Sequence, residues 1–218
     1  MSFSTQLSAG LSALDLQVSA GQQQALGDYL QLINKWNRSF NLVADSSYSQ
    51  LLSKHLLDCL AVLPHIEVQP GQVVLDVGSG AGFPGIPWAI FFPQVHFILL
   101  DSNGKKTRFL FQVQTELQLT NVRVENCRLE HYQSPGQIDI VTCRAFATLR
   151  EIIEKAGPLL QQQTRLLALK GRYPQSELEE LPSGFGLIAA TELQVPGLSA
   201  ERHLIEVGRI AATHTGIG

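Results

Sequence analysis

The sequence is poor in cysteine and in charged residues, and it has no long apolar run. Its cysteines, Cys59, Cys127 and Cys143, are three in number and lack the spacing of metal ligands, so we expect reduced thiols and no metal site. No apolar run reaches membrane-spanning length, and the N-terminus lacks the basic start and apolar core of a signal peptide. We therefore expect a cytoplasmic protein that does not contact a membrane.

The chain is nevertheless rich enough in apolar residues to fold. Hydrophobic residues make up 44% of the 218 positions and charged residues 16%, which excludes an intrinsically disordered protein. This length suits one domain with a short appendage. Internal repeats and low-complexity tracts are absent from the sequence.

Charge is distributed unevenly along the chain, whose formal net charge is −3. Residues 101–172 contain 11 Lys and Arg against 7 Asp and Glu, whereas the remaining residues contain 5 against 12. A basic zone on an acidic protein fits contact with a phosphate backbone. A solvated surface with uneven charge is the alternative interpretation.

The N-terminal third has helical periodicity. Apolar residues recur at three- and four-residue spacing over residues 20–42, and the triplet Asp45-Ser46-Ser47 offers an N-cap for a further helix that ends near Pro64. Residues 1–19 predict a short helix. We expect a helical section at residues 1–69, a main domain at residues 70–210 and a disordered tail at residues 211–218.

The main domain alternates strand and helix patterns. Strands are expected at residues 73–77, 95–101, 122–126, 138–143 and 166–170, with helices at 86–91, 105–117, 149–160 and, shorter, 175–181. The last two strands, 187–194 and 203–209, predict an antiparallel edge. The fold class is therefore α/β, with a doubly wound, mostly parallel, seven-stranded sheet.

A glycine-rich stretch follows the first expected strand. Gly80-Ala81-Gly82-Phe83-Pro84-Gly85 matches the G-x-G-x-x-G pattern of NAD- and FAD-binding proteins. The longer string Asp76-x-Gly78-x-Gly80-x-Gly82 is similar to the first motif of S-adenosylmethionine-dependent methyltransferases. That interpretation also explains Asp76, as a carboxylate near the cationic methionine end of the cofactor. We favour it over a dinucleotide site or a plain strand turn.

Polar side chains follow four further strands, at the edge where such sheets bind ligands. Asp101 ends the second strand, where a carboxylate accepts ribose hydroxyls; a helix N-cap is its alternative role. After the third strand, Leu129 is suited to contact adenine and Glu130 to accept its exocyclic amine, although such a glutamate is more often solvated. Arg144 and Lys170 follow the fourth and fifth strands.

These features together resemble the RsmG (GidB) family of bacterial small-subunit rRNA guanine-N7 methyltransferases. The resemblance covers residues 29–209 and is specific because many blocks match in order. The blocks are Lys35-Trp36-Asn37-x-x-x-Asn41-Leu42, His55-x-x-Asp58, the stretch from Asp76 to Gly85, Leu99-Leu100-Asp101-Ser102-x-Gly104-Lys105-Lys106, Thr142-x-Arg144-Ala145-Phe146-Ala147, Ala168-Leu169-Lys170-Gly171 and Glu201-Arg202-His203.

The resemblance implies an activity and its residues. It implies methyl transfer from S-adenosyl-L-methionine to N7 of guanine 527 in 16S rRNA, with 16S rRNA or the small ribosomal subunit as partner; we expect a monomer. The implied cofactor-binding set, with Asp76 and Gly80 added from the glycine motif, is Asp76, Gly78, Gly80, Phe83, Asp101, Leu129, Glu130 and Arg144. The implied catalytic or substrate-binding set is Arg128, Lys170 and Arg202, and Lys105 and Lys106 also match basic positions of the family.

The sequence departs from this family's usual pattern without losing a charge. Phe83 stands where leucine is common, and we expect its ring to stack on the cofactor. Cys59 and Cys143 stand where serine is usual. We expect Arg128, Lys170 and Arg202 to line one electropositive mouth, which requires the last strand to run antiparallel to its neighbours.

Two other functions stay open. A pyrimidine-C5 methyltransferase needs a cysteine nucleophile, and Cys143 lies at the end of the fourth strand, although no proline precedes it. A non-catalytic RNA-binding module is the second alternative. Guanine N7 has a lone pair and needs no general base, in agreement with the absence here of the Asn/Asp-Pro-Pro-aromatic motif of exocyclic-amine methyltransferases.

Overall fold

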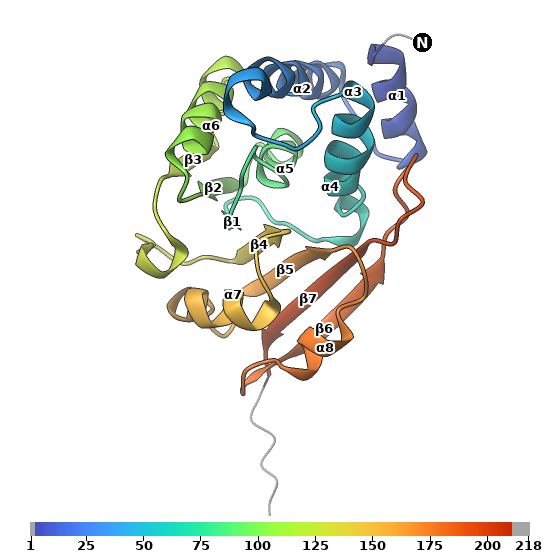
Figure 1. Cartoon of the computed structure of the whole chain (residues 1–218). Coiled ribbons are helices and arrows are strands. Elements are labelled where there is room, and N and C mark those ends of the chain that lie inside the picture. The colour runs from blue at the N-terminus through green and yellow to red at the C-terminus, as the bar shows by residue number, and fades with distance from the viewer. Residues whose placement is uncertain (1–2, 211–218) are drawn as a thin grey trace, which may run out of the picture.

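The computed structural model describes residues 3–210 and contains the mixed, mostly parallel sheet predicted from the sequence (Figure 1). The strand order in the sheet is β3-β2-β1-β4-β5-β7-β6. Strands β1 to β5 are parallel, and β7 is antiparallel to both β5 and β6. The strands are β1 (Val73–Val77), β2 (His96–Leu100), β3 (Val122–Glu125), β4 (Ile140–Arg144), β5 (Arg165–Lys170), β6 (Phe185–Glu192) and β7 (His203–Arg209).

The central strands are apolar on both faces, as expected when helices cover a parallel sheet on both sides. In β1, Val74 packs into one apolar cluster, whereas Leu75 and Val77 pack into the other. The strand order reverses between β1 and β4, because β2 and β3 are added on one side of β1 and β4 and β5 on the other, which puts the carboxyl ends of the parallel strands β1 and β4 beside each other. This switch point is where open α/β sheets bind ligands.

Helices form a thick layer on one face of the sheet and a thin layer on the other (Figure 1). Helices α1, α2, α4, α5 and α6 lie over one face, and α7 and α8 lie over the opposite face. Their bounds are α1 (Phe3–Ala13), α2 (Ala20–Phe40), α3 (Tyr48–Gln50), α4 (Asp58–Leu60), α5 (Gly85–Phe91), α6 (Gly104–Glu116), α7 (Leu149–Ala156) and α8 (Gln175–Glu179).

The expected single helix after Asp45-Ser46-Ser47 has a different form. A π-helical segment, Leu51–Leu57, separates the short α3 and α4, and a 3₁₀ turn at Leu63–His65 follows. Ser47 is the N-cap residue but its side chain makes no capping hydrogen bond. Single π-helical turns inside helices are frequent at functional sites, and this one contains His55 and immediately precedes Asp58.

Strands β1 and β7 have the predicted bounds, and the other five strands differ from the predicted bounds by one or two residues at one or both ends. A side-chain contact accounts for one of these differences. The third strand ends at Glu125 rather than at Asn126. The Asn126 side chain instead donates to the backbone oxygen of Asp101 at 2.9 Å, which links the segments that follow β2 and β3.

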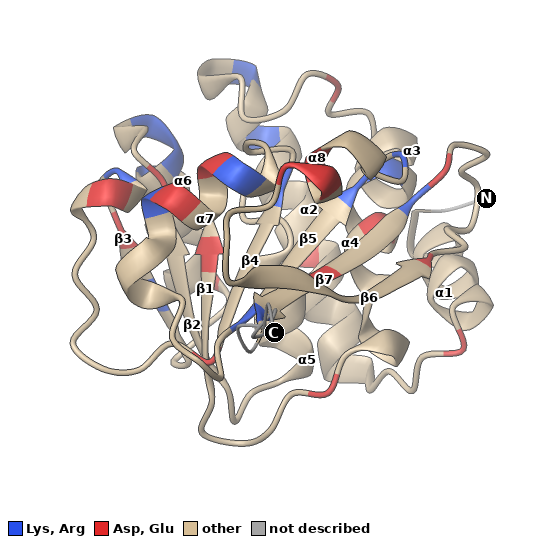
Figure 2. Cartoon of the chain, turned by 90° about the horizontal axis from the view of Figure 1, so that it is seen from below, with Lys and Arg blue, Asp and Glu red and all other residues tan. Residues whose placement is uncertain are grey.

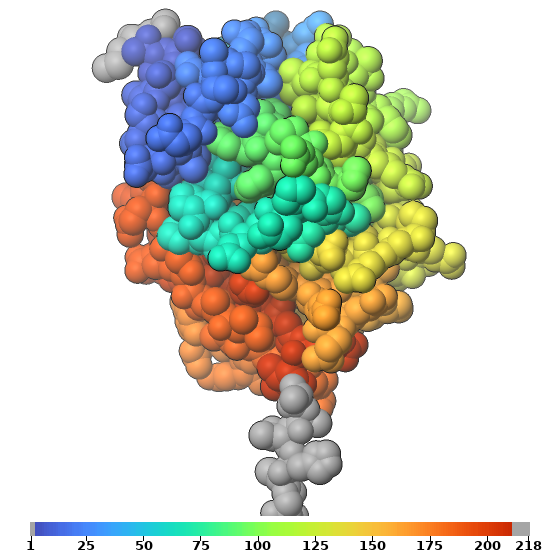
Figure 3. All heavy atoms as spheres, turned by 180° about the vertical axis from the view of Figure 1, so that it is seen from behind, coloured from blue at the N-terminus to red at the C-terminus, as the bar shows by residue number. Residues whose placement is uncertain are grey.

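The helical N-terminal section and the sheet share one apolar core. Leu26 of α2 and Leu56 belong to the same buried cluster as Phe97 of β2 and Phe109 of α6. Figure 3 shows residues near 50–65 packed without a gap against the C-terminal strands. The indole nitrogen of Trp88 also donates to the Cys59 carbonyl at 2.9 Å.

Two further findings apply to the described residues 3–210. None of their helices combines the length and apolar composition needed to span a bilayer. They hold no cluster of three or more His, Cys, Asp and Glu side chains placed to bind a metal ion. The predicted disordered tail, residues 211–218, lies outside the described part of the chain.

Candidate active site

The glycine loop, residues 78–85 between β1 and α5, depends on backbone conformations that glycine alone adopts readily. Gly78, Gly80 and Gly82 have φ angles of +68°, +61° and +100°. A Cβ at Gly82 would lie 2.6 Å from Ile86 Cγ1 and 3.0 Å from the Tyr29 hydroxyl. At Gly82 the loop therefore packs against the core too closely to leave room for a side chain.

Helix α2 holds the glycine loop from behind. The Tyr29 hydroxyl donates to the Ala81 carbonyl at 2.7 Å, and Tyr29 is fully buried. A buried hydrogen bond of this kind contributes about 1 kcal/mol net, and leaving the carbonyl unpaired costs more. The N-terminal helices are thus part of the structure that shapes the loop.

Asp101 links the end of β2 to the glycine loop. Its Oδ2 accepts from the Gly80 N–H at 2.9 Å, and its Oδ1 accepts from the Asn103 N–H at 2.8 Å. The N-cap of α6 is Asn103, whose side chain accepts from the amides of Lys105 and Lys106, so the alternative role of Asp101 as N-cap is wrong. Asp101 lines the cavity described next while bracing the loop.

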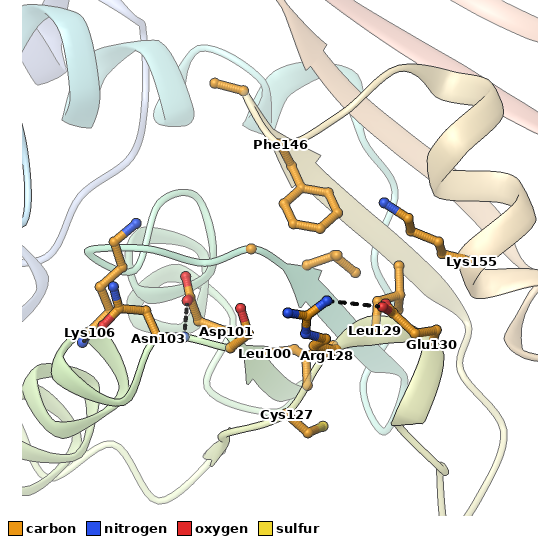
Figure 4. A pocket seen from close by; sticks show the side chains of 14 residues that line it. Leu100, Asp101, Asn103, Lys106, Cys127, Arg128, Leu129, Glu130, Phe146 and Lys155 are labelled. Carbon is orange, nitrogen blue, oxygen red and sulfur yellow. Dashed lines mark hydrogen bonds and ion pairs between the residues drawn. The ribbon is translucent and has the colours of Figure 1, made fainter.

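The first cavity lies beyond the carboxyl ends of β1 and β2 and has a volume of about 390 Å³ (Figure 4). This is the size of a small-ligand site. Leu129 and Glu130 lie in a 3₁₀ turn after β3, Leu129 buried and Glu130 exposed. The lining residues are Val77, Gly78, Leu100, Asp101, Ser102, Asn103, Lys106, Cys127, Arg128, Leu129, Glu130, Ala145, Phe146 and Lys155.

The first cavity suits a nucleoside-containing cofactor. Asp101 offers a carboxylate for ribose hydroxyls, Leu129 an apolar surface for a purine, and Glu130 an acceptor for an amine. The Arg128 Nη1 atom lies 3.9 Å from Glu130 Oε1, and both side chains are exposed, so this pair holds Glu130 only weakly. Gly78, Asp101, Leu129 and Glu130 therefore lie together as the sequence predicted.

Asp76 supports the loop from within the core. It is fully buried, its Oδ2 accepts from the Gly85 N–H at 3.0 Å, and within the described chain its Oδ1 has no partner. Burial raises its pKa to about 7. The carboxylate thus fixes the first turn of α5 against β1, and the first cavity as described does not include it.

Phe83, in the glycine loop, and Arg144, at the end of β4, contact each other. Phe83 is 3% exposed; its ring stacks on His55 with centroids 5.2 Å apart, and the Arg144 guanidinium carbon lies 5.2 Å from its centroid. The lining that residues 3–210 give the first cavity contains neither of them. Their predicted contact with the cofactor stays a prediction.

Arg144 belongs to an ion network that the sequence did not predict. Its Nη1 donates to Asp58 Oδ2 at 3.2 Å and to the Lys54 carbonyl at 3.1 Å, and its Nη2 donates to His55 Nδ1 at 2.9 Å. Burial, aided by the Arg144 charge, lowers the His55 pKa to about 4, so the ring is neutral at pH 7 and can accept. Asp58 also accepts from Arg202 Nε at 2.7 Å.

A second cavity, of about 440 Å³, lies beside the first. Arg144, Lys170 and Arg202 line it, together with Asp58, Ala145, Phe146, Ala147, Leu169, Gly171, Leu193 and His203. Strand β7 is antiparallel to β5 and pairs His203 with Lys170, so the start of β7 reaches this rim as the prediction required. Lys170 Nζ binds Glu177 Oε2 at 2.8 Å and the Ala147 carbonyl at 3.2 Å.

The expected electropositive mouth is divided. Lys170 and Arg202 line the second cavity, whereas Arg128 lines the first and is 71% exposed at its side chain. In Figure 2, basic segments around α6, α7 and α8 alternate with acidic ones. The edge therefore has positive charge in patches, because several of its cations are paired with carboxylates.

Cys59 and Cys143 have the environment of structural thiols, whereas Cys127 is half-buried and lines the first cavity. Cys143 is 3% exposed, and burial raises its pKa to about 12. Burial also raises the pKa of the Cys59 thiol. A thiolate nucleophile needs a lowered pKa and exposure, so Cys143 does not fit the pyrimidine-C5 mechanism.

Four residues at the two cavities and the ion network had no role predicted from the sequence: His55, Asp58, Phe146 and Lys155. His55 and Asp58 were visible as a spaced pair, and an aspartate in an apolar segment predicts a buried cation partner. Which cation it binds depends on strands about 90 and 140 residues away in the sequence. No local pattern contains that information.

Solved structures with the same fold have low sequence identity. The chain is similar to TrmN from Thermus thermophilus, with a TM-score of 0.55 and 18% identity over 70% of this chain and 48% of that one. It is also similar to a protein in the NADB-Rossmann superfamily from Streptococcus agalactiae, with a TM-score of 0.56 and 16% identity over 91% of this chain and 72% of the other. These likenesses establish the fold alone.

Sequence relatives are much closer. The ribosomal RNA small subunit methyltransferase G of Hahella chejuensis is 42% identical over 95% of this chain and 94% of its own length. The protein of that name from Nitrosococcus oceani is 45% identical over 92% of both chains. The family model GidB, rRNA small subunit methyltransferase G, matches residues 22–205. The chain therefore belongs to the GidB family, and it is an rRNA methyltransferase with a class I fold.

Proposed function

We propose that the protein transfers a methyl group from S-adenosyl-L-methionine to N7 of guanine 527 in 16S rRNA. The first cavity is the proposed cofactor site. There the glycine loop admits the ligand to its backbone, Asp101 accepts the ribose hydroxyls, Leu129 contacts adenine, and Glu130 accepts the adenine amine. The bound cofactor supplies an electrophilic methyl group on its sulfonium.

The second cavity is the proposed site of the target nucleotide. Arg144, Lys170 and Arg202 provide positive charge for the base edge and the flanking phosphates. The nearby carboxylates are engaged: Asp58 with two arginines, Glu177 with Lys170. This arrangement suits guanine N7, whose lone pair attacks without a general base.

The observation that best supports the proposal is that the two cavities are neighbours with a common border at Ala145 and Phe146. A cofactor in one and a base in the other would meet at this border, as methyl transfer requires reacting atoms about 3 to 3.5 Å apart. We infer a cytoplasmic enzyme that acts as a monomer on 16S rRNA or the small subunit.

The test is to map methylated nucleotides in small-subunit rRNA from cells with and without the gene. The expected result is one N7-methylguanine, at position 527, that disappears with the gene and returns with the wild-type gene. Purified protein is then given labelled cofactor and either naked 16S rRNA or small subunits from the deletion strain. Methyl label on a pyrimidine would support the C5 alternative, and cofactor binding without transfer to either substrate would support the non-catalytic module.

A further inference from the structure

Phe146 is a large aromatic residue in an exposed position between the two cavities. It follows β4, is 41% exposed, and lines both cavities. Its ring lies against Gly78, where an added Cβ would be 2.2 Å from Phe146 Cδ2. Figure 4 shows the ring extending over the first cavity, above the side chains of Asp101 and Arg128.

The border between the cavities is narrow. Within residues 3–210, Ala145 and Phe146 are the two residues that both linings share. Any group passing from one ligand to the other must cross this border. The Phe146 ring therefore lies where the reacting atoms have to meet, and its present position covers part of the glycine loop.

The chain on both sides of Phe146 is fixed. Arg144 is paired within the sheet, and its guanidinium binds Asp58. Lys170 Nζ donates toward the Ala147 carbonyl at 3.2 Å, and the Leu149 N–H donates to Glu177 Oε2 at 2.7 Å. Between these anchors, Ala145 has a φ of +50°, which is unfavourable for a residue with a Cβ. The backbone at Ala145 and Phe146 can therefore change to a more favourable conformation while the anchored residues on both sides stay in place.

We propose that Phe146 is a substrate-positioning residue: its ring leaves Gly78 when the cofactor binds and stacks on the target guanine, holding N7 toward the methyl group. This rests on the proposed function. Proteins hold unstacked bases of RNA on aromatic side chains, and removing such a ring weakens binding roughly 5- to 150-fold. Because the ring lies against Gly78, a cofactor that contacts this glycine must displace the ring, and we expect the cofactor to bind before the base.

The test uses three variants, Phe146→Ala, Phe146→Leu and Phe146→Tyr. The matched control is Phe111→Ala on the outer surface of α6, because Phe111 is 48% exposed and lines neither cavity. Calorimetry measures S-adenosylhomocysteine affinity. Steady-state kinetics measure methylation of small subunits from the deletion strain. We expect the alanine and leucine variants to bind S-adenosylhomocysteine at least as tightly as wild type but to lose roughly 5- to 150-fold in kcat/KM for the subunit. The tyrosine variant and the control should stay within about threefold of wild type.

Four outcomes would overturn the proposal. A leucine variant as active as wild type would show that bulk rather than an aromatic face is needed. An alanine variant that loses cofactor affinity in proportion to activity would make Phe146 a wall of the cofactor site. If wild type modifies guanine N7 and the alanine variant is equally active, this inference fails alone; if wild type modifies no guanine N7, the proposed function fails with it.

Discussion

Replacing Asp58 by asparagine removes the single carboxylate that holds two guanidinium groups in the second cavity. Asp58 is 4% exposed and accepts from Arg144 Nη1 at 3.2 Å and from Arg202 Nε at 2.7 Å. Asparagine has nearly the same shape, but its amide is neutral and its NH₂ group would face a guanidinium. The variant therefore leaves two positive charges close together without their counter-ion.

The size of the effect follows from how buried the partners are. Breaking a fully buried ion pair costs about 3 to 5 kcal/mol. The Arg144 and Arg202 side chains are 19% and 21% exposed, so water screens part of that cost, and we expect a loss of about 2 to 3 kcal/mol in the free energy of unfolding. For a domain of this size, that corresponds to a fall in Tm of roughly 4 to 12 °C.

Urea denaturation at pH 7, followed by circular dichroism, measures this loss. Glu154→Gln is the matched control, because Glu154 pairs with Arg150 on the exposed surface of α7 at 3.7 Å; it should change the free energy of unfolding by about 0.5 kcal/mol or less. If Asp58→Asn changed stability no more than the control, the Asp58 network would not stabilise the fold. A double-mutant cycle with Arg202→Met should then give a coupling energy near zero, instead of the 1 kcal/mol or more expected for residues in contact.

Three further predictions concern single carboxylates and a thiol. Asp76 has a folded pKa of about 7 and an unfolded pKa near 4, so its contribution to stability is complete below pH 4 and is lost as pH rises toward 7. In urea titrations, the free energy of unfolding of wild type minus that of Asp76→Asn should therefore fall by about 2 kcal/mol between pH 5.5 and pH 8. A difference that does not change with pH would contradict the raised pKa of Asp76. Asp101→Ala should weaken cofactor binding at least tenfold by calorimetry, because it removes the ribose acceptor and the Gly80 bond; unchanged affinity would refute the role. Cys143→Ser should keep methyl transfer within about threefold in a radiolabel assay, whereas loss of transfer with cofactor binding intact would revive the C5 mechanism.

The sheet was predictable because each strand is indicated by the residue pattern of its own short segment. The run Val73 to Val77 is apolar apart from Asp76, as expected of a buried parallel strand, and the glycines that follow it allow one sharp turn. Asp101 could be placed because a residue after a parallel strand lies at the ligand-binding edge whatever the rest of the chain does. Strand order then brought Asp101, Leu129 and Glu130 into one cavity without further information.

The sequence located Phe83 and Arg144 but could not predict where their side chains lie. The Phe83 ring packs against Tyr29 and His55 and does not line the first cavity, and those contacts come from helices distant in sequence. Arg144 lines the second cavity rather than the first because its guanidinium pairs with the buried carboxylate of Asp58. Side-chain direction at a strand end depends on tertiary partners, which the pattern of a single strand does not contain.

The common core of the N-terminal helices and the sheet has a consequence for synthesis. Leu26 and Leu30 of α2 lie in the same cluster as Phe109 of α6, so this core cannot be completed until more than 100 residues have been translated. Until then, the apolar surface that α6 covers in the folded protein stays exposed to solvent and to chaperones. The same dependence means that the alternating α/β part, expressed without residues 1–69, would expose the face that these helices cover and would aggregate, so the helical section cannot be exchanged as a separate module.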